Sequence, residues 1–152
     1  MEIVSCSARK FDILLNQRKP SNRGTVKRDY VGFKYLNKDN FDDVNNCTVL
    51  IDNGKLLCVM SYKVELKLSK HILRYHKTYE HITINYIDVR SDKKDDWLER
   101  HLIEDLCSNC SKSYLKLSPT IDISRMEYDG DVDDIVYSIK EFSPKARVKV
   151  KK

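Results

Sequence analysis

The amino-acid sequence predicts a single α/β domain in which helices pack on a mixed and mostly antiparallel sheet. The chain has 152 residues, which suits one domain over residues 1–152. An Asp-Asn-Gly turn at residues 52–54 separates two β-prone runs, which predicts a central hairpin. From residue 97 onward the apolar residues recur at steps of three and four, which predicts helices that cover the sheet.

The first half of the chain is predicted to supply most of the strands. The β-prone runs cover residues 3–6, 30–36, 47–51, 56–68 and 82–89. Between the first two runs lie a helical turn at residues 10–16 and a basic loop at residues 17–28. In the last run the apolar residues change face between Tyr86 and Ile87, which predicts a β-bulge.

The second half alternates between helices and short strands. Asp95 or Asp96 is placed to cap the first of the helices, and Asp131, Asp133 and Asp134 suit the positive end of the second. The predicted order is a helix over residues 97–110, a strand over 114–117, a helix over 131–142 and a final edge strand over 146–151.

Basic residues are concentrated at the two ends of the chain. Residues 1–38 hold nine Lys and Arg against three acids, residues 39–142 fourteen against twenty, and the tail 143–152 five against none. If the two ends meet, they form one basic face that attracts phosphate; two solvated ends are the alternative. The predicted contacts with nucleic acid or another partner are Arg18, Lys19, Arg23, Lys27, Arg28, Lys145, Arg147 and Lys149.

The sequence predicts a protein that neither inserts into a membrane nor is secreted. No apolar run approaches the ~20 residues that a membrane helix needs, and the N-terminus lacks the apolar stretch of a signal peptide. Five cysteines, an odd number, indicate reduced thiols in the cytoplasm, or in the nucleus for a virus of eukaryotes. Abundant Lys, Asn, Ile and Tyr with only two Ala are typical of AT-rich genomes, including those of phages and large DNA viruses.

Residues 47–142 resemble the GNAT superfamily of acyl-coenzyme-A-dependent N-acetyltransferases. In that family a strand leads into a phosphate-binding turn and a helix, and residues 89–103 fit this pattern without a gap. Val89 matches the end of the strand, Lys94 the basic position, and the pair at 102–103 the apolar positions. The three positions that the family fills with glycine hold Asp95, Trp97 and Glu99.

The resemblance implies acetyl-CoA as the cofactor and places the catalytic groups. A Tyr followed by a Phe on the last helix fits Tyr137 and Phe142, so Tyr137 is the implied general acid for the leaving thiolate. Asp88 is the implied general base, with Glu80 as the other available carboxylate, and a strand N–H near Val89 would stabilise the oxyanion. The implied cofactor contacts are Ile87, Val89, Lys93, Lys94, Asp95, Trp97 and Leu98.

Two other functions remain open at this point. One is a descendant of the family that keeps the scaffold but has lost coenzyme A binding. The other is a small phage- or virus-encoded interaction protein that binds a host protein or nucleic acid through its basic surfaces. No metal site is expected, because neither the cysteines at 107 and 110, nor the histidines at 71, 76 and 81, nor the acidic run 129–134 has a suitable spacing.

Overall fold

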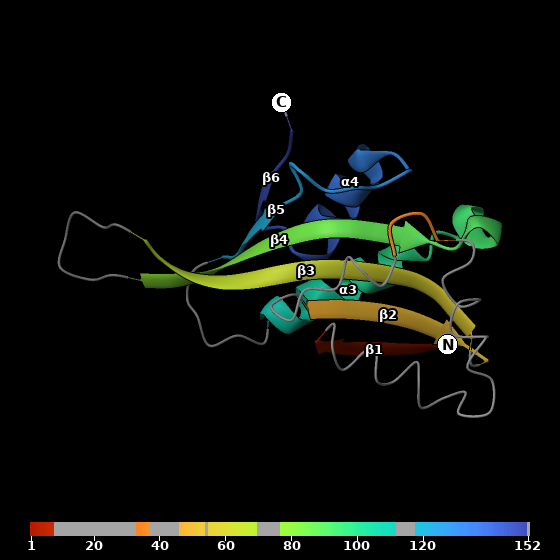
Figure 1. Ribbon diagram of the computed structural model, residues 1–152. Helices are drawn as coiled ribbons and strands as arrows, with labels where there is room; N and C mark the ends of the chain where they lie inside the picture. Colours follow the sequence, from red (N-terminus) through yellow and green to blue (C-terminus); the bar gives the residue numbers. More distant parts are fainter. Residues whose placement is uncertain (8–32, 37–45, 54, 70–76, 112–117, 152) are drawn as a thin grey trace.

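The computed structural model describes residues 1–7, 33–36, 46–53, 55–69, 77–111 and 118–151, and within them it shows one six-stranded sheet with two α-helices (Figure 1). The predicted mixed α/β class is therefore confirmed. In chain order the elements are β1 (Glu2–Ser7), β2 (Asn46–Asp52), β3 (Lys55–Ser69), β4 (Lys77–Val89), the 3₁₀ helix η2 (Ser91–Asp96), α3 (Glu99–Ser111), β5 (Thr120–Asp122), α4 (Val132–Phe142) and β6 (Arg147–Lys149).

The sheet has the strand order β1-β2-β3-β4-β5-β6, with an antiparallel half and a parallel half. Strands β1 to β4 pair antiparallel, whereas β5 runs parallel to both β4 and β6. Parallel neighbours need a crossover connection, and α3 and α4 provide these two crossovers. Both helices consequently begin at the same end of the sheet, where β4 stops.

The predicted central hairpin is confirmed. Strands β2 and β3 pair antiparallel up to Asp52 and Lys55, the last pair before the turn. Asn53 has a φ of 51°, in the left-handed region that Asn tolerates better than most residues. The turn residues therefore adopt the backbone conformation that their types favour.

The following strand contains a bulge, as predicted, but it lies at Asn85 and not between Tyr86 and Ile87. Ser61 faces Tyr86 and Tyr62 faces Ile84, so Asn85 is an extra residue on β4. The Asn85 carbonyl accepts a hydrogen bond from the Glu127 N–H at 3.0 Å, and the Ile87 N–H donates to the Glu127 carbonyl at 3.1 Å. The chain beyond β5 is thereby held against β4 beside the bulge, and residues 128–130 pass the end of this strand.

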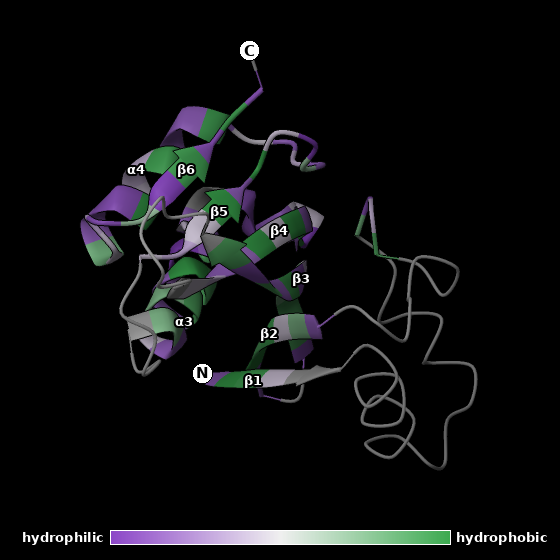
Figure 2. Cartoon of the chain, turned by 90° about the vertical axis from the view of Figure 1, so that its left-hand side faces the viewer, coloured by the Kyte–Doolittle hydropathy of each residue, from purple (hydrophilic) through white to green (hydrophobic). Residues whose placement is uncertain are grey.

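The core lies on both faces of the sheet. On one face α3 and α4 pack against the sheet through Leu102, Ile103, Ile135 and Ile139, as the hydropathy colouring illustrates (Figure 2). On the other face a smaller cluster contains Val49, Val59 and Tyr86 from the strands, with Leu36 over them. Strand β2 is buried on both faces between these two clusters.

Two predicted elements differ in the structure, the first long helix and the strand predicted over residues 30–36. Helix α3 begins at Glu99 instead of residue 97, because η2 follows β4 and Trp97 has a φ of 55° that breaks the helical path. Asp95 and Asp96 belong to η2 and so do not cap α3, and residues 33–36 form no strand. The described strand before α4 covers Thr120–Asp122, whereas residues 10–16, 17–28 and 114–117 lie outside the described residues.

In the described part of the chain, neither α-helix combines the length and the apolar character that crossing a membrane requires.

We expect Leu102→Ala, at the contact between α3 and the sheet, to lower the free energy of unfolding by about 2–5 kcal/mol. Leu102 is fully buried, so the substitution leaves a cavity among the core residues. Leu66→Ala is the control, because 66% of Leu66 is exposed and a surface change costs at most about 0.5 kcal/mol. Equal losses for the two variants in urea unfolding would contradict this packing.

Candidate functional site

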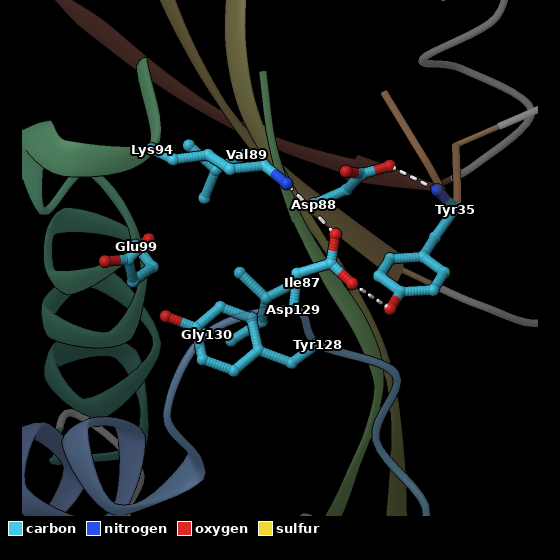
Figure 3. A pocket seen from close by; sticks show the side chains of 9 residues that line it. All are labelled: Tyr35, Ile87, Asp88, Val89, Lys94, Glu99, Tyr128, Asp129 and Gly130. Carbon is cyan, nitrogen blue, oxygen red and sulfur yellow. Dashed lines mark hydrogen bonds and ion pairs between the residues drawn. The ribbon is translucent and has the colours of Figure 1, made fainter. Parts of the chain in front are cut away.

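A cavity of about 250 Å³ lies at the end of β4, beside the start of α3 (Figure 3). It is built from four segments that are distant in the sequence: the piece 33–36, the end of β4, the η2–α3 turn and the linker between β5 and α4. Its lining residues are Tyr35, Ile87, Asp88, Val89, Lys94, Glu99, Tyr128, Asp129 and Gly130.

Asp88 anchors the first of these segments to β4. Asp88 is only 3% exposed, and its carboxylate accepts backbone N–H groups from Lys34 at 3.2 Å, Tyr35 at 2.6 Å and Leu36 at 2.7 Å. A buried carboxylate needs such partners, because without them its desolvation costs several kcal/mol. The implied general base is therefore occupied with three amides, and it sets the position of Tyr35 in the cavity wall.

Asp129 joins three segments at the rim of the cavity. Its carboxylate accepts from the Lys34 ammonium at 2.8 Å, the Tyr35 hydroxyl at 2.7 Å and the Lys94 ammonium at 3.0 Å. The hydrogen bonds from Lys34, Tyr35 and Lys94 hold the pKa of Asp129 well below its usual range. The Asp129 carboxylate is therefore ionised at neutral pH, and it forms ion pairs with Lys34 and Lys94.

Glu99 is the carboxylate that faces the cavity without such compensation. It is the first residue of α3 and is only 6% exposed. Burial raises the pKa of Glu99, and the nearby charge of Asp134 adds to the rise, while its own backbone N–H opposes it. A carboxylate with a raised pKa is a stronger base than an ordinary surface carboxylate, which is the property that a general base requires.

Tyr128 provides a phenol hydroxyl opposite Glu99. In Figure 3 its ring points the hydroxyl toward α3, where Glu99 lies. Burial raises the pKa of Tyr128, and the charge of Glu99 raises it further, so the hydroxyl keeps its proton and donates hydrogen bonds. The ring packs directly over Gly130, where an added Cβ would lie 2.5 Å from the Tyr128 Cζ. Glycine is thus required at 130 for the ring to occupy this position.

The backbone N–H of Val89 points into the same region. The Arg90 N–H donates to the Leu57 carbonyl of β3 at 2.9 Å, whereas the Ile87 N–H points away from β3 to Glu127. Because successive N–H groups of a strand point to opposite sides, the Val89 N–H also points away from β3. Val89 lines the cavity, so its N–H is a backbone donor at the cavity wall.

The turn after Val89 carries three basic side chains, each paired with an acid. The distances are 3.1 Å for Arg90 to Asp92, 3.9 Å for Lys93 to Asp96 and 3.0 Å for Lys94 to Asp129. A second hollow of about 520 Å³ lies beside the turn and includes Lys55, Arg90, Lys93 and Leu98 in its lining. Trp97 closes the turn in the left-handed conformation, at one of the positions where the resemblance expects glycine.

The structure brings most of the implied cofactor contacts together around this turn. The first cavity is lined by Ile87, Val89 and Lys94, together with Asp88. The second hollow is lined by Lys93 and Leu98, and a third hollow by Trp97. The side chain of Asp95 is not among the described ones.

The implied general acid lies apart from these groups. Tyr137 is 70% exposed on α4 and lines none of the described hollows. Its catalytic role stays a prediction.

The basic residues predicted for partner contact fall into two groups. Lys145, Arg147 and Lys149 are exposed around β6, and the Arg147 guanidinium lies 5.2 Å from the centre of the Tyr79 ring. The others, Arg18, Lys19, Arg23, Lys27 and Arg28, lie outside the described residues. Contact with nucleic acid or with a host protein stays a prediction.

Sequence reasoning missed Tyr35, Tyr128 and Asp129 as site residues, and it considered Glu99 only as a misplaced side chain in a glycine pattern. A sequence pattern could have identified Glu99. It lies at the start of a helix and next to the apolar stripe of that helix, so its side chain is a candidate for burial. The other three come from segments whose approach to β4 no local pattern reveals. Within the described part of the chain, no group of three or more His, Cys, Asp or Glu residues is arranged to hold a metal ion.

No family model and no curated protein matches this chain. Among solved structures, the chain is similar to an aminoglycoside acetyltransferase from an uncultured soil metagenomic sample, crystallised with sisomicin, at a TM-score of 0.49 and 11% identity over 99% of this chain and 92% of that one. A protein from Bacillus halodurans with four substitutions has a TM-score of 0.48 at 12% identity, over 91% and 92% of the two chains. A ribosomal-protein-alanine N-acetyltransferase from Brucella melitensis biovar Abortus 2308 has a TM-score of 0.44 at 12% identity, over 93% and 89%.

The fold is GNAT-like. The succession of hairpin, strand, turn, helix, strand and helix is the one that the resemblance predicted for residues 47–142. The strand order and the connections of the chain itself show this arrangement.

We expect Asp88→Asn to lower the free energy of unfolding by about 1–3 kcal/mol, because an amide NH₂ then faces backbone N–H groups in a buried site. Asp92→Asn is the control, because the Asp92 side chain is largely exposed and pairs with Arg90 at the surface. Its effect in urea unfolding should stay within about 0.5 kcal/mol. An Asp88→Asn variant as stable as Asp92→Asn would contradict the anchoring role.

The stability that Asp129 contributes should depend on pH. Its folded pKa is depressed, so its ion pairs stabilise the protein above the unfolded pKa of about 3.9 and this stabilisation fades as the pH falls toward the folded value. The difference in unfolding free energy between the wild type and Asp129→Asn should therefore shrink between pH 5 and pH 2. A difference that is constant over this range, measured by urea unfolding, would contradict the assignment.

Proposed function

We propose that the chain is an N-acyltransferase that transfers an acyl group to an amine in the cavity beside Val89. One observation carries the proposal: a buried carboxylate, a strand N–H and a phenol hydroxyl line the same 250 Å³ cavity. Acyl transfer to an amine needs these three functions, namely a base, a donor for the oxyanion and a donor for the leaving group.

Acetyl-CoA is the acyl donor that the resemblance implies, and its thioester supplies an activated carbonyl carbon when it is bound. The residues around the turn fit such a molecule. Lys55, Arg90 and Lys93 would hold its phosphates in the larger hollow, and the Val89 N–H would meet its carbonyl group in the smaller cavity. The acids now paired with Arg90 and Lys93 are more than half exposed, and such surface pairs contribute only about 0–1 kcal/mol. Asp52, Asp92 and Asp96 line the same hollow, so bound phosphates would have to displace the carboxylates from Arg90 and Lys93.

Glu99 is the general base of the proposed reaction. An amine is mostly protonated at neutral pH and must lose a proton before its nitrogen can attack a carbonyl carbon. Burial raises the pKa of Glu99, which improves the match between this carboxylate and an ammonium group. Glu99 takes the role because Asp88 already accepts three backbone N–H groups.

Val89 and Tyr128 stabilise the charge that moves during the transfer. The Val89 N–H is fixed by the strand and donates to a carbonyl oxygen as that oxygen gains negative charge. The Tyr128 hydroxyl keeps its proton and donates a hydrogen bond to the departing sulfur. Tyr128 is preferred to Tyr137 for this role because it lines the cavity, whereas Tyr137 is exposed on α4.

We expect Glu99→Gln to lower kcat/KM for acetyl-CoA and a primary amine by about 10²-fold or more, since the base is lost while the shape is kept. Release of free thiol measures the rate. Glu104→Gln, an exposed position on the same helix, should leave the rate unchanged. If no primary amine supports thiol release and millimolar acetyl-CoA does not raise the Tm of the wild type, the proposed function is wrong.

Two tyrosine variants test which hydroxyl donates a hydrogen bond to the departing sulfur. We expect Tyr128→Phe to lower kcat by about 10-fold to 10²-fold with little change in KM, because a donor to the departing sulfur acts only in the transition state. Tyr137→Phe should leave kcat unchanged. The reverse result would assign the role to Tyr137, as the resemblance alone implies.

A further inference from the structure

Basic side chains gather on the sheet face that points away from α3 and α4, near the start of β4. Successive side chains of a strand alternate between the two faces, and Tyr62, Ile82, Ile121 and Val148 point to the core on the helix side. Their neighbours therefore point to the opposite side, which we call the open face. At this end it carries Lys63 and Lys67 of β3, Tyr79 and His81 of β4, and Arg147 and Lys149 of β6.

The pairing of the strands places these side chains beside one another. Lys67 pairs with Tyr79 across β3 and β4, and the Arg147 guanidinium lies 5.2 Å from the centre of the Tyr79 ring. Thr120 of β5 aligns with His81 on one side and with Arg147 on the other, so these positions form one row across the sheet. The open face is thus a continuous surface over four strands.

Two acids share the open face with four Lys and Arg residues. Glu65 lies 3.1 Å from Lys63, whose hydrogen bond and charge lower the pKa of Glu65. Burial by itself would raise the pKa of Asp122, but hydrogen bonds from Ser124 and the charge of Lys149 leave that pKa lowered. Both acids are therefore ionised at neutral pH, and the remaining positive charge attracts anionic ligands.

The bases around β6 have no acidic partner in the described part of the chain. Arg147 and Lys149 are exposed, as are Lys145 before the strand and Lys151 after it. None of the four forms an ion pair with a residue in the described ranges. Phosphate groups can consequently bind them without displacing a carboxylate, unlike at the turn after Val89.

Tyr79 distinguishes one class of polyanion from the others. Its ring is partly exposed, and the Arg147 guanidinium lies against it. Aromatic rings and guanidinium groups both stack with nucleobases, and each stacked base strengthens binding independently of its identity. An acidic peptide or a sulfated polysaccharide has no base to stack. The combination of unpaired bases with an aromatic ring on a sheet face therefore favours a nucleic acid with accessible bases.

We propose that the open face binds single-stranded RNA or DNA. Lys67, Arg147 and Lys149 contact phosphates, and a nucleobase stacks on the pair formed by Tyr79 and Arg147. A single strand fits better than a duplex, because the bases of a duplex are stacked on one another. The open face lies near the start of β4 and the cavity of the proposed acyl transfer at its end. The nucleic-acid site is therefore independent of that reaction.

Fluorescence anisotropy of labelled oligo(dT) and oligo(U), titrated with the full chain at several salt concentrations, tests the site. The logarithm of the binding constant should fall linearly with the logarithm of the salt concentration. We expect Lys149→Gln to reduce the magnitude of this slope by about 0.7, the value of one phosphate contact in a single strand. Lys140→Gln is the control, because it removes the same charge from an exposed position on α4 and should leave the slope unchanged.

A substitution of Tyr79 tests the stacking separately from the charge. Tyr79→Val keeps a β-branched residue in the strand but removes the ring. It should weaken oligo(dT) binding by about tenfold, with the salt slope unchanged and with binding of heparin unaffected.

Several results would overturn the nucleic-acid site. They are no binding of either oligonucleotide at low salt, equal effects of Lys149→Gln and Lys140→Gln, and a duplex bound as tightly as the single strand. Oligo(dT) binding that is unaffected by Tyr79→Val would also contradict it and would indicate a surface for polyanions in general. Binding that depends on both Lys149 and Tyr79 supports the site, whether or not the protein transfers an acyl group.

Discussion

The arrangement of the site depends on the burial of the Asp88 carboxylate at the end of β4. A buried carboxylate must be hydrogen-bonded, and Asp88 meets this requirement with three consecutive N–H groups from Lys34 to Leu36. This fixes a segment from the first quarter of the chain against the central strand. Tyr35 consequently becomes a wall of the cavity, and its hydroxyl reaches Asp129, to which Lys94 also donates. One buried charge thus organises three otherwise separate segments.

The extra residue in β4 brings a further segment to the same cavity. Asn85 interrupts the pairing with β3, and Glu127 pairs with β4 beside the interruption. The chain then continues to Tyr128 and Gly130 across the end of the strand, where Val89 presents an N–H group to the cavity. Helices α3 and α4 both begin at this end, so Glu99 and Asp134 approach the same space from two elements. Burial, with a smaller contribution from the charge of Asp134, raises the pKa of Glu99.

Sequence reasoning reached the parts of this structure that local chemistry determines. The Asn-Gly turn predicted the hairpin, the change of face at Tyr86 and Ile87 predicted the bulge, and the apolar stripes predicted both helices. The sequence did not predict the left-handed conformation of Trp97, because a tryptophan gives no indication of a positive φ. Helix α3 therefore begins at Glu99, two residues after the predicted start. Contacts such as Lys34 with Asp129 join residues 95 positions apart, and no periodicity encodes them. The candidate cavity lies at the strand end that the sequence indicated, but half of its polar groups come from segments that the sequence could not place.

The central claim is that the Val89 N–H is an open donor in a cavity that receives an acyl thioester. Amide chemical shifts recorded during a titration with acetyl-CoA test it most directly. We expect the Val89 and Glu99 amides to shift strongly, while Val64, on the distant arm of β3, does not respond. Without ligand, the Val89 amide should exchange with solvent faster than the Arg90 amide, which is bonded to Leu57. Unchanged Val89 and Glu99 resonances at millimolar acetyl-CoA, or shifts confined to other parts of the chain, would contradict it.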